Sequence, residues 1–92
     1  MLVWNLCAAE PRPPFSAILA CELEGGGIVG AHRQQESAEV LIVVEGEGVA
    51  RVGESPVTLH PGVVVELPLG QTLALENVLP ERSMRYLIVK AK

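Results

Sequence analysis

Short apolar runs separated by glycine and proline turns fill the sequence from residue 15 onward. The runs are rich in valine and other residues that favour strands, and none shows the 3.6-residue apolar spacing of an amphipathic helix. We therefore expect strands over residues 15–24, 28–34, 39–45, 49–52, 57–59, 63–67, 72–76 and 84–90. Short strands at regular intervals, joined by Gly/Pro turns, predict an all-β sandwich or barrel.

The PRPP sequence at residues 11–14 separates the start of the chain from the strand-rich part. Proline fixes an extended, non-helical path, so we expect residues 1–14 to form an N-terminal extended segment. Residues 15–92 then form a single domain, in keeping with a length of 92 residues. A domain of this size buries only about 60–65% of the surface of its unfolded chain, so pairing with a second copy would add stability.

Residues 39–45 make the strongest of the expected strands. Val40, Ile42 and Val44 point to one face, whereas Leu41 and Val43 point to the other, because successive side chains of a strand alternate. Apolar residues on both faces indicate that both faces are covered. The domain's own core covers one face, and we expect a second subunit to cover the other, which predicts a homodimer.

The composition excludes several classes of function. The chain is 49% hydrophobic with a net charge of −4, and its acidic residues are all Glu. It has no basic stripe, so we expect no nucleic-acid partner, and the absence of Asp excludes a Ser/His/Asp triad. No apolar run approaches the ~20 residues that span a membrane, and the N-terminus is a poor signal peptide. We expect a cytoplasmic protein with no membrane partner, in which Cys7 and Cys21 are free thiols; a bond between them is the less favoured alternative.

Three polar side chains of different chemistry are close together near the centre of the sequence. His32 and Gln34 are two residues apart and point to the same face of a strand. Glu39 begins the strong apolar strand and can reach the same space. An imidazole, an amide and a carboxylate in one cavity predict either a metal site or a hydrogen-bonded remnant of one.

Two spaced sets of residues resemble the paired signature of the cupins, G-x5-H-x-H-x(3,4)-E-x6-G and G-x5-P-x-G-x2-H-x3-N. The first set contains Gly26, His32, Gln34, Glu39 and Gly46. The second set contains Gly62, Pro68, Gly70, Leu73 and Asn77. The resemblance covers residues 26–77, and it implies a small single-domain cupin. Its fold would be a double-stranded β-helix, a jelly-roll barrel of the RmlC-like type, often found as a homodimer.

The sequence departs from the cupin pattern at two of the four positions that hold a metal in metal-binding cupins. His32 and Glu39 are in place, but Gln34 replaces the second His and Leu73 replaces the third. An amide oxygen is a weak ligand compared with imidazole, and a Leu side chain offers no ligand. The resemblance therefore implies a degenerate metal site made of His32, Gln34 and Glu39.

Three interpretations of this site remain open: a hydrogen-bonded pair in a decayed site, a weakly bound divalent metal, and a metal-free acid/base pair of His32 and Glu39. We expect no firmly bound cofactor. The pocket is predicted to be lined by four apolar side chains, those of Leu41, Val43, Leu73 and Leu75. The favoured function is binding of a small molecule, or that of a non-catalytic module such as a structural dimer. The alternative is a metal-dependent oxygenase or isomerase using a divalent metal held by His32, Gln34 and Glu39.

Overall fold

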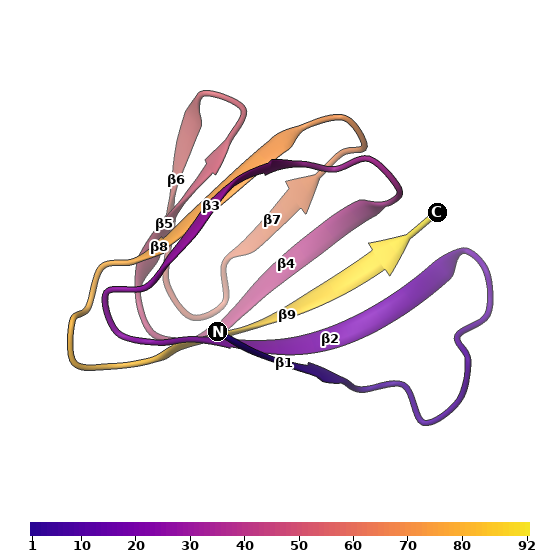
Figure 1. Cartoon of the computed structure of the whole chain (residues 1–92), viewed down its shortest axis with the longest axis horizontal. Coiled ribbons are helices and arrows are strands. Elements are labelled where there is room, and N and C mark those ends of the chain that lie inside the picture. Colours follow the sequence, from indigo (N-terminus) through magenta and orange to yellow (C-terminus); the bar gives the residue numbers. More distant parts are fainter.

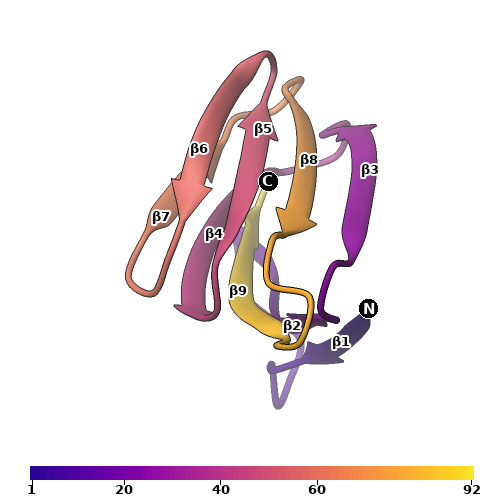
Figure 2. The same cartoon turned by 90° about the vertical axis from the view of Figure 1, so that its left-hand side faces the viewer.

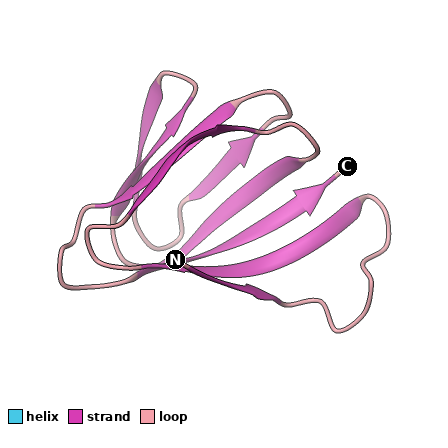
Figure 3. Cartoon of the chain, viewed as in Figure 1, coloured by secondary structure: helices cyan, strands magenta, loops and turns pink.

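The computed structural model describes all of residues 1–92, and every regular element in it is a strand (Figure 3). No helix could cross a membrane. The strands, in chain order, are β1 (Leu2–Asn5), β2 (Phe15–Leu23), β3 (Ile28–Arg33), β4 (Ala38–Glu45), β5 (Gly48–Val52), β6 (Ser55–Leu59), β7 (Val64–Leu67), β8 (Thr72–Asn77) and β9 (Met84–Ala91).

The strands form two facing sheets of the jelly-roll kind (Figures 1 and 2). One sheet has five strands in the order β1-β2-β9-β4-β7, and the other has four in the order β3-β8-β5-β6. Every pairing is antiparallel. The all-β barrel predicted from the strand pattern is confirmed, and each expected strand is present within a residue or two of its predicted limits.

The structure adds one strand that the sequence pattern did not predict. Residues 2–5 of the N-terminal segment form β1, which lies at the edge of the five-stranded sheet. It pairs with β2 in a register that places Val3 opposite Cys21 and Trp4 opposite Ala20. Residues 2–5 of this segment therefore belong to the sheet, and residues 6–14 connect β1 to β2.

The core lies between the two sheets and is almost entirely aliphatic. Along β2, β9 and β4 the residues that point inward form rows, such as Cys21, Tyr86 and Val43, or Leu19, Ile88 and Leu41. Leu73 and Leu75 of β8 face them from the four-stranded sheet and are buried. Alternation along each strand thus separates the core from the outer faces.

The glycines of the two motifs lie in turns and have backbone conformations that other residues rarely adopt. Gly26, Gly46, Gly62 and Gly70 all have positive φ, between 69° and 96°. Gly46 is the most constrained, because a Cβ there would lie 2.9 Å from Met84 Cα. These positions explain physically why the spaced motif requires glycine.

The outer face of the five-stranded sheet is also apolar. Val40 and Ile42 are only partly covered in the monomer, and Val44 is 53% exposed. Trp4 lies on the same face and is 50% exposed. The prediction that both faces of β4 are covered thus holds within this chain for the inner face alone.

Candidate functional site

A cavity of about 180 Å³ lies inside the barrel, and its wall is mostly apolar. It is lined by twelve residues: Met1, Val3, Leu19, Cys21, Val29, His32, Glu39, Leu73, Leu75, Tyr86, Ile88 and Lys90. The five-stranded sheet contributes most of them, β3 and β8 contribute four, and Met1 precedes β1. The apolar wall is thus interrupted by a few groups able to donate or accept a hydrogen bond.

The structure brings together only part of the predicted site. His32 and Leu73 are neighbours across β3 and β8, and both line the cavity together with Glu39. Gln34 does not line it. This residue follows the end of β3 and borders two polar hollows, one of which Glu39 and Lys90 also line.

Of the four apolar residues predicted to line the pocket, two line the cavity and two do not. Leu73 and Leu75 line the cavity. Leu41 and Val43 point inward and are buried in the core, but they are not among the residues that line the cavity.

Glu39 has an ionic partner that sequence reasoning missed. Lys90 Nζ lies 3.4 Å from Glu39 Oε2, and the two residues are opposite each other on β9 and β4. The Glu39 side chain is 5% exposed, so its charge needs a counter-charge close by. The signal was present in the alternation of β9, where Tyr86, Ile88 and Lys90 all point inward.

His32 contributes an accessible imidazole at the cavity edge. Its Nδ1 lies 3.3 Å from Gly30 O, and when Nδ1 carries the proton it donates to that carbonyl. Nε2 is then an acceptor. The side-chain contact that His32 makes is with Gly30 O, whereas Glu39 forms its ion pair with Lys90.

Gln34 is buried, but its side chain is poorly partnered. Its backbone N–H donates to Gln71 O at 2.9 Å, and its carbonyl accepts from Gly70 N–H at 2.7 Å. These bonds hold the chain after β3 against the turn before β8. The side-chain Nε2 is buried and has no hydrogen-bond partner.

Cys21 and Tyr86 face each other across β2 and β9, and both line the cavity. Burial raises the pKa of the Cys21 thiol, and the negative charge of Glu39 raises it further. Burial is also the main cause that raises the pKa of the Tyr86 hydroxyl. Both groups are protonated at neutral pH, and Tyr86 donates a hydrogen bond to Met1 Sδ at 3.0 Å. Cys21 is therefore not a thiolate nucleophile.

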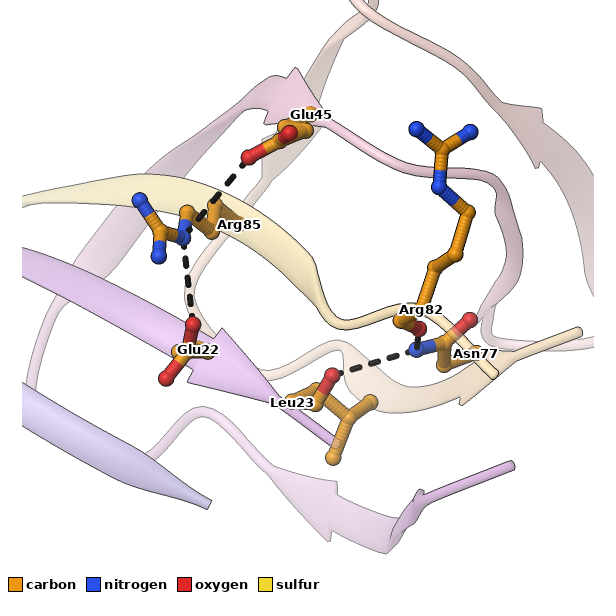
Figure 4. A network of polar contacts seen from close by, with 6 residues as sticks. All are labelled: Glu22, Leu23, Glu45, Asn77, Arg82 and Arg85. Carbon is orange, nitrogen blue, oxygen red and sulfur yellow. Dashed lines mark hydrogen bonds and ion pairs between the residues drawn. The ribbon is translucent and has the colours of Figure 1, made fainter. Parts of the chain in front are cut away.

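Asn77, the last residue of the second motif, has a structural role at the other end of the barrel (Figure 4). Its buried Nδ2 lies within hydrogen-bond distance of three carbonyls, those of Leu23 at 3.1 Å, Glu24 at 3.0 Å and Arg82 at 2.7 Å. Its Oδ1 accepts from Leu79 N–H at 3.0 Å. The side chain thus ties the loop between β8 and β9 to the end of β2.

The residues present do not fit a metal centre of the cupin kind. Three firm protein ligands are usual for a catalytic metal, but no group of three His, Cys, Asp or Glu side chains comes together here. Glu39 is already paired with the Lys90 ammonium, and a second cation beside it would be repelled. Leu73, at the position of the third His, supplies only an apolar surface.

Comparison with known proteins agrees with the fold. Residues 19–90 match the cupin domain family. The structure is similar to a cupin domain from Schizosaccharomyces pombe, with a TM-score of 0.87 and 17% identity over 98% of this chain and 59% of that one. A Cupin 2 conserved barrel domain protein from Salinispora arenicola has a TM-score of 0.80 and 23% identity, over 98% and 74% of the two chains.

A further similar structure carries the description of a predicted oxalate decarboxylase, from Thermotoga maritima. Its TM-score is 0.78 at 23% identity, and the match covers 85% of this chain and 67% of that one. A search of curated proteins gave no match. The family match spans most of the chain, and the sheets, turns and motif positions agree with it. The chain therefore belongs to the cupin family.

Proposed function

We propose that this protein binds a small organic molecule in the barrel cavity without a metal ion. The observation that supports this proposal is the Lys90–Glu39 ion pair, in which an ammonium provides the positive charge beside the motif carboxylate. The cavity of about 180 Å³ is large enough for a ligand, since an engineered apolar cavity of about 150 Å³ binds benzene. In this proposal the site binds a ligand and does not catalyse a reaction.

The metal-dependent oxygenase or isomerase is the competing function. In its favour, His32 and Glu39 line one cavity, and a similar structure is described as a predicted oxalate decarboxylase. Against it, Gln34 lies outside the cavity and Lys90 neutralises Glu39. Metal-free ligand binding is therefore the favoured function, and one experiment distinguishes it from the metalloenzyme.

The experiment combines ligand screening with metal analysis on protein purified without a histidine tag. A panel of small organic compounds is tested by thermal shift and by NMR, with and without prior dialysis against a chelator. We expect at least one compound to bind equally well in both samples. Stoichiometric metal that is lost in His32→Ala, with ligand binding that depends on it, would instead support the metalloenzyme.

We also propose that the protein is a homodimer through the outer face of the five-stranded sheet. Five strands about 4.8 Å apart and up to about 25 Å long give a flat face of roughly 600 Å², without counting the extra surface of the side chains. This area is close to the ~800 Å² per partner that a stable interface buries. Trp4, Val44 and Val64 are about half exposed on this face. A cytoplasmic location is proposed as well, because Cys7 and Cys21 are both free.

Light scattering at micromolar concentration tests the dimer. Leu87 lies on the outer face of the central strand β9, opposite Ala20 and Ile42. We expect twice the monomer mass for the unaltered protein and the monomer mass for Leu87→Glu, which places a charge in the middle of the proposed interface. Thr58→Glu, on an exposed position of β6, is the matched control and is expected to remain dimeric. A monomeric unaltered protein would contradict the proposal.

A further inference from the structure

We propose that the ligand of the cavity is a small monocarboxylate with an apolar body about the size of a benzene ring, and that its carboxylate binds Lys90. This inference rests on the proposed function and goes further by naming the chemical class of the ligand. It follows from the charge, the exposure and the shape of the cavity, taken in turn.

Lys90 is the cationic group best placed to receive a ligand. Its side chain is 35% exposed, whereas the side chain of its partner Glu39 is only 5% exposed. An ammonium has three donors, and Glu39 Oε2, at 3.4 Å, is the one acidic partner of Lys90 in the structure. Lys90 lines both the cavity and the polar hollow beside Gln34, and the group complementary to its ammonium is an anion.

The rest of the cavity suits an apolar body. Nine of the twelve residues that line it are hydrophobic, among them Leu19, Val29 and Ile88, and a volume of about 180 Å³ exceeds the roughly 150 Å³ that holds benzene. Burial of this body contributes hydrophobic free energy, and the single charged head lies at the Lys90 end. Tyr86 and Cys21, both protonated, offer no second charge that would favour a dicarboxylate.

Glu39 sets the strength of this interaction. A bound carboxylate shares the Lys90 ammonium with Glu39, and the two negative charges repel each other. Removing the charge of Glu39 should thus tighten carboxylate binding, although it removes an ion pair from the fold. A purely structural ion pair would not show this effect on binding.

The test is a titration with benzoate and with benzamide, its neutral isostere, followed by NMR and calorimetry. We expect benzoate to bind the unaltered protein about tenfold to a hundredfold more tightly than benzamide, as a charge-assisted hydrogen bond predicts. Glu39→Gln should tighten benzoate binding several-fold. Lys90→Met should abolish the preference for benzoate over benzamide, and Lys92→Met, on an exposed lysine outside the cavity, should not change it.

Two further measurements keep the test decisive if Lys90→Met folds poorly. The double variant Lys90→Met with Glu39→Gln leaves no unpaired charge and should bind the two compounds equally. Because the chain has only two lysines, Lys90 and Lys92, methylation with ¹³C-labelled formaldehyde gives one signal for each, apart from that of the N-terminal amine. Benzoate should shift the Lys90 signal and leave that of Lys92 unchanged.

The possible results separate this inference from the proposed function. Equal binding of benzoate and benzamide by the unaltered protein would overturn the Lys90 anchor while supporting a small-molecule cavity. A preference for benzoate that survives in the double variant would also overturn it. If no compound of the wider panel binds at millimolar concentration, the proposed function itself is wrong.

Discussion

The two ends of the barrel differ in how completely their buried polar side chains are hydrogen-bonded. At one end, every polar atom of the Asn77 side chain is hydrogen-bonded to backbone groups of the chain, and Figure 4 shows the bonds to Leu23 and Arg82. At the other end, Glu39 has one ion pair with a partly exposed lysine, and Gln34 Nε2 has no partner. A fully satisfied group stabilises one conformation, whereas a partly satisfied one leaves capacity for a ligand. The Asn77 end thus has a structural role, and the Glu39 end is the one where we propose that a ligand binds.

The Asn77 end should be the more sensitive of the two to substitution. Asn77→Ala removes the side-chain bonds to the carbonyls of Leu23 and Arg82 and leaves buried acceptors without donors. We expect a loss of about 3–4 kcal/mol in the free energy of unfolding, a large part of the roughly 5–14 kcal/mol of a domain of this length. Urea unfolding followed by circular dichroism measures it.

The control for this substitution is a second asparagine with a hydrogen bond near the surface. Asn5 Oδ1 accepts from Cys7 N–H at 2.9 Å in an exposed position, so Asn5→Ala should cost about 1 kcal/mol or less. Similar losses in the two variants would mean that the Asn77 network contributes no more than an ordinary surface bond.

The ion pair at the other end should contribute less. Lys90→Met leaves the Glu39 carboxylate buried without its counter-charge, but water reaches the lysine position, so we expect a loss of about 1–2 kcal/mol. The double variant with Glu39→Gln should recover at least half of this loss, because no charge is left unpaired. If the double variant were less stable than Lys90→Met, the Glu39 carboxylate would have to make a further stabilising interaction besides its ion pair with Lys90.

The sequence predicted the fold well and the site only in part. Apolar alternation and Gly/Pro turns located the strands because these signals are local. Strand β1 was missed because its four residues carry no turn signal before the prolines. The motif placed His32, Glu39 and Leu73 in one cavity, but nothing in the motif points to Lys90, since its pairing with Glu39 depends on the register of two strands about fifty residues apart.

Tyr86 allows a test of the middle of the cavity, between the two ends. Burial raises the pKa of its hydroxyl above the ordinary value of about 10. The folded state therefore holds this proton more tightly than the unfolded state, so the contribution to stability is complete below about pH 10 and decreases as pH rises above it. The decrease is at most about 1.4 kcal/mol per pH unit.

Tyr86→Phe removes the titrating group and should flatten this decrease. Urea unfolding between pH 8 and pH 11 should show the unaltered protein losing stability faster than the variant above about pH 10. The pKa of Cys21 is also raised. This residue is present in both proteins, and it begins to lower the free energy of unfolding of both from about pH 8.5. Parallel curves above pH 10 would mean that the Tyr86 hydroxyl is as well solvated as in the unfolded chain.

The smallest effect is expected at Gln34, the buried amide that contrasts most directly with Asn77. Gln34→Met keeps the length of the side chain and removes the Nε2 that has no partner, while the backbone bonds to Gln71 and Gly70 remain. We expect a change within about 1 kcal/mol, in the stabilising direction, because the desolvation cost of an unpaired donor disappears. Gln35→Met, at the exposed neighbouring position, should leave stability unchanged. A loss above about 2 kcal/mol at Gln34 alone would mean that its amide is as firmly bonded as that of Asn77, and the contrast between the two ends would not hold.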